Sequence, residues 1–527
     1  MMARRWVAGV TIGVLTLAGC VPAPTPDTRT TAPSCADLPA RIVDAVQDYV
    51  DSFAATTSSG VGGAVTARQA DFAEVTAALN RLGEELGCDR EELATGVRQE
   101  LTRLRGGTPL QDAIADTFRA GPLGTADPSD LGPLQLGVGS ADELVAALAV
   151  AGSGSVIRIA GGEYRLSQPL VMLRPVTLVG AGAAATVLVS TAADAALVLA
   201  TDGDAVVRDL AIAHEGPQPA SVVLVAGGGY VLERLRIDGG AAVGSGGYGV
   251  VLRPASNPLL GTGTRRVLDD VTLVGTPAGG VVVAGEEAPT IRDVSVTGSA
   301  GCGLCFVERS AGTVSGATIS DTQVGVRVDD EAAPDVGEAT VTRSEVGVAL
   351  TGSGATRVTG GALRENTTGI QVTGDGPAVV AGVTVADSVD VGVRVSGSAR
   401  PTLSELLVTG STPVGVAVVG QAAPTCDGGR VETTGEVGMI WAERGAGTAT
   451  GVSVVGPRLA LQLSDDASPT LVGVTAAAAA GALLANGRSA GTVDLSCTPG
   501  DGALVALADQ TTTAVTAGVD CRLVDER

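Results

Sequence analysis

The sequence contains no lysine, a single histidine and very few aromatic residues. All 34 cationic side chains are arginines, and aromatic residues make up only 2% of the 527 positions. The formal charge of −23 excludes nucleic acid as a partner, because phosphate contacts need clustered cations. The scarcity of aromatic rings gives little support to a groove that stacks sugar rings. What the chain has in abundance is glycine, at 75 residues, together with alanine and valine.

Residues 1–19 have the pattern of a signal peptide. Arg4 and Arg5 form a positive start, and the apolar stretch 7–18 is too short to span a bilayer, which needs about 20 residues. The stretch runs into Leu-Ala-Gly-Cys20, which resembles the lipobox of bacterial lipoproteins. That resemblance implies a diacylglycerol on the Cys20 thiol, which anchors the exported chain to a membrane of the cell envelope, facing outward. The alternative is an ordinary cleaved signal with an incidental cysteine.

A tether and a helical segment are expected to follow. Residues 20–34 hold four prolines and no apolar periodicity, which predicts an extended, lipidated tether. Over residues 35–120 apolar residues recur at three- and four-residue spacing, which predicts a small α-helical segment that acts as a spacer or docks a partner. Cys35 precedes its first helix and Cys88 follows its second, so a disulfide is expected in an oxidising compartment. Residues 121–139 are expected to form a linker.

A short phrase recurs through the second half of the chain at intervals of about 22 residues. It consists of glycine or alanine, an apolar residue, a variable residue and an apolar residue, and a second phrase of alternating side chains follows it in each repeat. Two or three short strands per repeat, separated by glycine and proline turns, predict a mainly β, parallel β-helix solenoid. Val326 and Val348 then point inward in one buried ladder, while Arg327 points outward. The phrases begin at Gly280, Gly303, Gly325, Gly347, Gly369, Gly392, Gly415, Gly438, Ala460, Gly481 and Ala503.

The region after residue 139 has the pattern of a solenoid start. Ser140 precedes an amphipathic helix and Glu143 follows three residues later, as in a capping box. The segment 156–164 ends in Gly-Glu-Tyr, and the segment 170–182 ends in Val-Gly-Ala-Gly. This opening resembles the pectate-lyase-like superfamily. The resemblance covers residues 140–527 and implies a right-handed parallel β-helix with an N-terminal capping helix; family members include lyases, hydrolases, epimerases, adhesins and non-catalytic surface proteins.

Few residues are candidates for catalysis. Glycoside cleavage needs two carboxylates that flank the bond, and Asp329 and Asp330 beside the outward Arg327 are the most suggestive set. Asp329 and Asp330 are nevertheless expected to lie in a solvated turn between strands. His214, at a strand end next to Glu215, is also expected to be a solvated turn residue rather than an acid–base group. The Gly-His-Gly and Arg-x-Lys of the family's polygalacturonases and the Asp-Pro-His-Glu of its epimerases are missing.

The remaining cysteines are expected to have structural roles. Cys497 and Cys521 lie about one coil apart, which predicts a disulfide between the last two coils. Cys302 and Cys305 form a Cys-x-x-Cys, for which a local disulfide or two unpaired thiols is expected rather than half of a zinc site. Cys426 takes an inward position in its repeat, which predicts an inert core thiol.

These patterns predict a lipid-anchored β-helix protein of the cell envelope that binds or scaffolds at the cell surface without catalysis. Its expected partners are the membrane, through the lipid, and a polysaccharide or protein of the envelope, and no cofactor or metal is expected. The alternative is a polysaccharide-active lyase, hydrolase or epimerase whose site the motifs do not show. A further alternative is a metal-handling accessory protein that uses Cys302.

Overall fold

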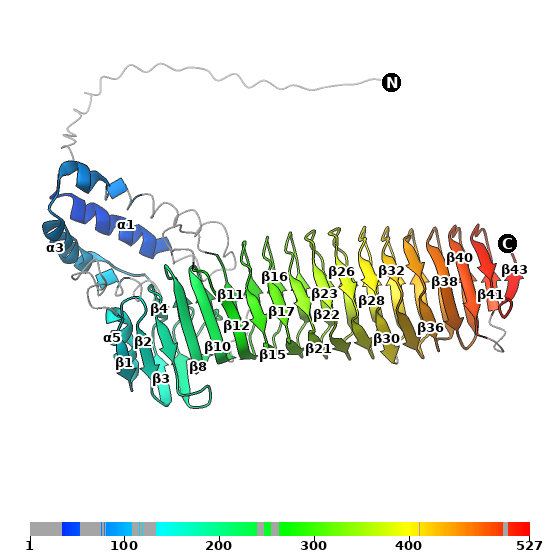
Figure 1. Cartoon of the computed structure of the whole chain (residues 1–527), viewed down its shortest axis with the longest axis horizontal. Coiled ribbons are helices and arrows are strands. Elements are labelled where there is room, and N and C mark those ends of the chain that lie inside the picture. Colours follow the sequence, from blue (N-terminus) through cyan, green and yellow to red (C-terminus); the bar gives the residue numbers. More distant parts are fainter. Residues whose placement is uncertain are drawn as a thin grey trace, which may run out of the picture.

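The computed structural model describes residues 34–52, 75, 78–79, 81–107, 115, 118–119, 133–239, 247–254, 263–410, 412–498 and 504–527. The predicted signal peptide, Cys20, the tether up to residue 33 and residues 121–132 of the predicted linker lie outside these residues. The chain forms a long parallel β-helix, with a helical segment beside its N-terminal coils (Figure 1). In the described residues no helix has the length and apolar character needed to cross a membrane.

One face of the solenoid is a sheet of 16 parallel strands, one per coil, termed sheet B. Val326 pairs with Val348, and Val348 pairs with Ile370 on the next coil, so the predicted repeat of about 22 residues is confirmed. The strands of sheet B are β4 (Leu170–Met172), β7 (Leu197–Leu199), β9 (Val223–Val225), β11 (Tyr248–Leu252), β13 (Gly279–Val283), β16 (Cys302–Phe306), β19 (Val324–Val328), β22 (Val346–Leu350), β25 (Thr368–Val372), β28 (Val391–Val395), β31 (Val414–Val418), β34 (Val437–Trp441), β37 (Leu459–Leu463), β39 (Gly481–Ala485), β41 (Leu504–Leu507) and β43 (Arg522–Asp525).

The other 27 strands in the described residues form sheet A, in which most coils contribute two short strands on either side of a corner. They are β1 (Gln135–Val138), β2 (Val156–Ile159), β3 (Gly162–Leu166), β5 (Thr177–Val179), β6 (Thr186–Ser190), β8 (Asp204–His214), β10 (Gly229–Asp238), β12 (Arg266–Val274), β14 (Thr290–Arg292), β15 (Ser295–Thr297), β17 (Thr313–Ser315), β18 (Thr318–Ser320), β20 (Asp335–Gly337), β21 (Thr340–Thr342), β23 (Arg357–Thr359), β24 (Ala362–Arg364), β26 (Val379–Ala381), β27 (Thr384–Ala386), β29 (Thr402–Ser404), β30 (Leu407–Gly410), β32 (Thr425–Asp427), β33 (Arg430–Thr433), β35 (Thr448–Thr450), β36 (Ser453–Val455), β38 (Thr470–Ala477), β40 (Thr492–Cys497) and β42 (Ala514–Ala517).

Single residues in the left-handed conformation turn the chain at these corners. Asp209, Arg234 and Asp270 have φ of 60°, 50° and 53° within β8, β10 and β12. Positive φ is disfavoured for L-residues, and aspartate tolerates it better than most. Fifteen described non-glycine residues have positive φ, and all of them except Arg234 and Arg343 are aspartate or glutamate. Thirteen of the 57 acidic residues of the chain therefore lie at positions of positive φ, where they turn the chain.

The core is a narrow column of side chains inside the coils. Phe306 and Trp441 lie in this column, buried, as their inward positions in the repeat predict. Each buried aliphatic side chain contributes about 1.5–3 kcal/mol to stability. One row of the column, in register from coil to coil and at most 5% exposed, consists of Val326, Val348, Ile370, Val393 and Val416.

A helix closes the N-terminal end of the column. In α5 (Ala141–Val150) the Ser140 hydroxyl accepts a hydrogen bond from the Glu143 amide at 3.2 Å, and Leu144 is fully buried against the first strands. β1 pairs with β2 and lies before the helix. The solenoid therefore begins within the predicted linker rather than at residue 140, because the capping helix is inserted after the first strand.

The helical segment is a compact unit. It contains α1 (Leu38–Ser52), the helical residues 81–86, α3 (Arg90–Glu100) and the 3-10 helix η2 (Leu101–Arg103). The Gln47 amide group donates to the Arg105 carbonyl at 2.7 Å and accepts from the Arg105 amide at 2.9 Å, which fixes α1 to the end of η2.

This segment packs on the outer face of sheet B. One apolar cluster joins both parts, so the segment covers the first coils of that face, where the sequence predicts only a spacer or a docking bundle. Helical-segment members include Ile42, Val46, Tyr49, Leu101 and Leu104, and sheet members include Val171, Val198, Leu224, Val251, Val282, Cys302 and Cys305.

The inward row yields a direct test of the fold. We expect Ile370→Asp to lower the free energy of unfolding by about 4 kcal/mol or more, because it buries an unpaired charge. Gln371→Asp, on the outer side of the same strand, is the matched control and should change it by less than about 1 kcal/mol. Ala349 is a poorer control because it is only 6% exposed. Chemical denaturation followed by circular dichroism measures both, and equal losses would contradict this assignment of inside and outside.

Candidate functional site

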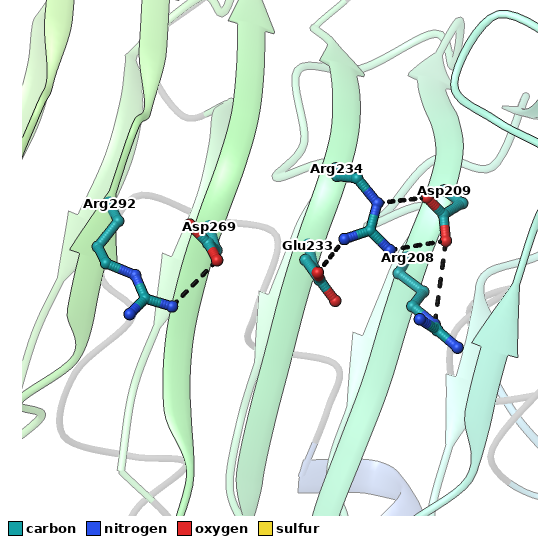
Figure 2. A network of polar contacts seen from close by, with 6 residues as sticks. All are labelled: Arg208, Asp209, Glu233, Arg234, Asp269 and Arg292. Atoms are coloured by element: carbon teal, nitrogen blue, oxygen red, sulfur yellow. Dashed lines mark hydrogen bonds and ion pairs between the residues drawn. The ribbon is translucent and has the colours of Figure 1, made fainter.

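Charged side chains gather on the outer face of sheet A, over β8, β10, β12 and β14 (Figure 2). Strand register aligns Arg208, Glu233, Asp269 and Arg292 in one row across four coils. Two further charged residues lie beside this row, at the corners of β8 and β10. The charged cluster is the set Arg208, Asp209, Glu233, Arg234, Asp269 and Arg292.

Arg234 is the centre of this charged cluster. Its Nε lies 2.6 Å from Oδ1 of Asp209 and its Nη2 lies 2.9 Å from Oδ2, a two-pronged contact between neighbouring coils. Arg234 also contacts the carboxylate of Glu233 on its own strand. On the next two coils, Arg292 Nη2 lies 3.0 Å from Asp269 Oδ2. Parallel strands about 4.8 Å apart bring such side chains within reach of each other.

Pairing shifts the pKa values of the two central residues of the charged cluster. The hydrogen bonds from Arg234 lower the pKa of Asp209 below its ordinary value, and those to Asp209 raise the pKa of Arg234. Both groups are therefore charged at neutral pH. A glycosidase needs one carboxyl group with a raised pKa to protonate the leaving oxygen. The Arg234–Asp209 pair can exchange partners with a charged ligand, but it offers no proton donor of that kind.

Arg327, Asp329 and Asp330, the most suggestive catalytic candidates in the sequence, lie at the end of β19 on the outer side of the solenoid. Arg327 Nε is 2.6 Å from Asp329 Oδ2, and Asp329 also accepts from the Thr351 hydroxyl. Asp330 has φ of 52° and its Oδ2 accepts a hydrogen bond from the Glu308 amide at 2.9 Å. The structure thus places Asp330 in a turn that it links to the preceding coil, while Asp329 is occupied by Arg327.

His214 corrects a sequence expectation. The interpretation as a solvated turn residue is wrong, because the side chain is buried, at 1% exposure. Its Nε2 lies 3.1 Å from the Ala192 carbonyl and 3.0 Å from the Asp194 carbonyl. Both carbonyl groups belong to one turn of the preceding coil. The imidazole ring of His214 is therefore hydrogen-bonded to that turn at the end of β8. The neighbouring Glu215 pairs instead with Arg165 at 3.3 Å.

Glu287 is a buried charged residue that no sequence pattern singles out. Its Oε1 accepts from the Tyr230 hydroxyl at 3.0 Å and lies 2.7 Å from Nε of Arg266. Burial raises the pKa of Glu287, and the contacts to Arg266 and Tyr230 oppose this rise. Its side chain is 2% exposed, whereas that of Glu286 is 69% exposed. The sequence of a Glu-Glu pair at a turn does not tell which glutamate faces inward. Because Glu287 is buried and contacts Tyr230 on β10 and Arg266 on β12, its role is structural.

Six of the seven described cysteines lie in three disulfide-compatible pairs. The Cα atoms are 5.5 Å apart in the bridge Cys35–Cys88, 5.7 Å in Cys302–Cys305 and 5.3 Å in Cys497–Cys521. In the chain-entropy account, bridges across 53 and 24 residues contribute about 3–4 kcal/mol, and a bridge across 3 residues about half of that. Cys426 is free and buried, and burial raises the pKa of its thiol to about 12. Within the described part of the chain no three potential metal ligands gather.

Comparisons with known proteins concern the solenoid. The model of the family "right handed beta helix region" matches residues 221–384 and 279–431, which supports the right-handed parallel β-helix. No curated protein is matched by the sequence.

Three solved structures are similar in fold to this chain. The A-module of a mannuronan C-5 epimerase from Azotobacter vinelandii is 14% identical, with 73% of this chain and 98% of that chain covered and a TM-score of 0.39. The catalytic domain of a GH87 α-1,3-glucanase in complex with nigerose is 11% identical, with 76% and 69% covered and a TM-score of 0.36. An alginate lyase from Paenibacillus sp. is 12% identical, with 55% and 93% covered and a TM-score of 0.30. Likeness at this level carries no argument about activity.

The two adjacent glutamates provide a matched test of the structure. We expect Glu287→Ala to lower the free energy of unfolding by about 3 kcal/mol, because it leaves the Tyr230 hydroxyl buried without its acceptor and Arg266 without its carboxylate. Glu286→Ala removes an exposed ion pair with Arg309 and should cost less than about 0.5 kcal/mol. Urea denaturation of both variants measures the difference, and similar losses would show that Glu287 is not a buried partner.

Proposed function

We propose that this chain is an exported, lipid-anchored protein of the bacterial cell envelope that binds or scaffolds other envelope components without catalysis. The pairing of its surface charges is the observation that carries this proposal. A catalytic arginine or carboxylate is held toward the space that a substrate occupies. Several arginines on this solenoid instead reach carboxylates of neighbouring coils, as in the pairs Arg234–Asp209, Arg292–Asp269, Arg343–Asp321 and Arg488–Asp466.

The protonation of the surface carboxylates supports the same proposal. Burial raises the pKa of the Glu287 carboxyl group, but this group is buried inside the solenoid. A general acid for glycoside cleavage needs such a shift at a position that a substrate can reach. Four further carboxyl groups have a pKa that hydrogen bonds from neighbouring groups lower; they are Asp37, Asp209, Asp321 and Asp525.

The shape of the solenoid suits a long or repetitive partner. Sixteen strands of sheet B, about 4.8 Å apart, extend over roughly 70 Å. Exposed ion pairs are worth about 0–1 kcal/mol, so a charged partner can open them at little cost. A polysaccharide or an envelope protein with its own charged groups would thus find many equivalent contacts along the solenoid.

Cys20 supplies the proposed anchor. We expect Cys20→Ser to move the protein from the membrane pellet to the soluble exported fraction, because stable anchoring needs the acyl chains. Cys426→Ala alters a buried thiol and is the control, which should stay with the membrane. Fractionation and immunoblotting of cells measure both. Equal membrane retention of wild type and Cys20→Ser would contradict the anchor.

The alternative is a polysaccharide-active enzyme. Arg327 and Arg394 lie on one outward row of sheet B, with Ala349 and Gln371 between them, and this row is the feature that favours an extended substrate there. Arg394 is paired with Asp390 at 3.2 Å, which weakens this alternative.

A screen of neutral and acidic polysaccharides separates the two functions. For the purified chain we expect retention of at least one envelope polysaccharide or protein, with no new reducing ends and no unsaturated products. Arg488→Ala, far along the solenoid, serves as the control for Arg327→Ala and Asp329→Ala. Product formation that persists in Arg488→Ala and disappears in the other two would establish the enzyme instead.

A further inference from the structure

The Cys302–Cys305 pair does not join separate parts of the fold. Both cysteines lie on β16, three residues apart, whereas the other two disulfides span 53 and 24 residues. Entropy lost on closing a loop grows with the length of the loop, so this bridge constrains the unfolded chain least. β16 is also held on both sides by its ladders with β13 and β19. The fold therefore has little need of this bond.

Both sulfur atoms face the outside of sheet B. Cys305 shares its row with Val282 and Arg327, whereas Leu304 and Phe306 are fully buried in the core column. A Cβ atom at Gly303 would meet the side chain of the core residue Ile319, so Gly303 faces inward like Leu304. The first and fourth residues of β16 therefore both face outward, in the apolar cluster outside sheet B. This placement makes the pair part of the surface on which the helical segment packs.

The pair lies where the cover of sheet B ends. Cys302 and Cys305 belong to the same apolar cluster as α1 and η2 and are 9% and 3% exposed. On the next coil Arg327 takes the equivalent position and is half exposed. The two sulfur atoms are thus shielded from solvent and lie at the margin of the covered area, where local opening would expose them.

We propose that Cys302 and Cys305 form a redox-active pair that exchanges with an external dithiol, and that the helical segment controls access to it. A thiolate of the dithiol attacks one sulfur atom of the bridge and forms a mixed disulfide. The second thiol of the dithiol then displaces the protein cysteine. The external dithiol is oxidised to a disulfide and supplies two electrons and two protons, so Cys302 and Cys305 end as thiols. An oxidised partner drives the reverse reaction.

The other cysteines provide internal controls. Cys497–Cys521 joins the last coils, so its opening should accompany a loss of stability. Cys426 is buried, with a thiol pKa of about 12, and therefore holds almost no thiolate at neutral pH. Neither should react as Cys302 and Cys305 do in the folded protein.

Selective reduction tests the redox pair. The purified chain is titrated with dithiothreitol, the free thiols are trapped with an alkylating agent, and peptide mass spectrometry identifies the labelled cysteines. We expect Cys302 and Cys305 to be labelled before Cys497 and Cys521, with the circular dichroism spectrum unchanged; the bridge of the exposed Cys35 serves as a reference for an accessible disulfide. The double variant Cys302→Ser, Cys305→Ser should melt within about 3 °C of the wild type, and Cys497→Ser, Cys521→Ser clearly lower. Labelling of Cys302 and Cys305 only with unfolding, or after Cys497 and Cys521, would overturn the proposal.

Two matched truncations test the control by the helical segment. Leu101→Ala loosens the cover, and Leu507→Ala makes the same truncation in the core column at the far end of the solenoid. We expect Leu101→Ala to speed the labelling of Cys302 and Cys305 by roughly tenfold or more, and Leu507→Ala to leave the rate unchanged. If both variants react at the wild-type rate, the helical segment does not control access; if both accelerate equally, the opening is global.

Discussion

The structure depends on each coil stacking in register on the next. Parallel main-chain hydrogen bonds hold neighbouring coils together along both sheets, and aliphatic rows such as Val326, Val348 and Ile370 fill the narrow interior. Side chains within a row are of similar size because each rests on its counterpart one coil away. A large aromatic residue is accommodated singly, as at Phe306 and Trp441, since the column has room for few of them.

This stacking also governs the surface. A charged residue on one coil has its counterpart on the next coil only about 4.8 Å away, so opposite charges pair along the solenoid. Arg234 with Asp209 and Arg343 with Asp321 are examples. Asp330 and other acidic residues occupy left-handed turns, and Asp330 accepts a main-chain amide of the preceding coil. The strong negative charge is thus partly a consequence of the turns and cannot be interpreted only as a binding surface.

The helical segment divides the outer face of sheet B into two parts. Over the first coils Val198, Leu224 and Val251 belong to one apolar cluster with residues of α1 and η2, and on the coil after Cys305 the same face carries the half-exposed Arg327. The covered part joins the solenoid to the chain that leads toward the proposed anchor at Cys20. The redox pair that we propose lies at the border between the two parts.

The sequence by itself determined the solenoid, its repeat, its capping helix and the inward positions, because period-two alternation within a strand and a fixed repeat leave one way to bury the valines. Helical periodicity likewise predicted α1. Only the tertiary structure decided that the helical segment covers sheet B, that His214 is buried and that Glu287 rather than Glu286 faces inward. These outcomes depend on how a turn or a helix packs against a neighbouring coil, which is a long-range contact that no local pattern encodes. The charged cluster has the same origin, since Asp209 and Arg234 meet across coils and not along the chain.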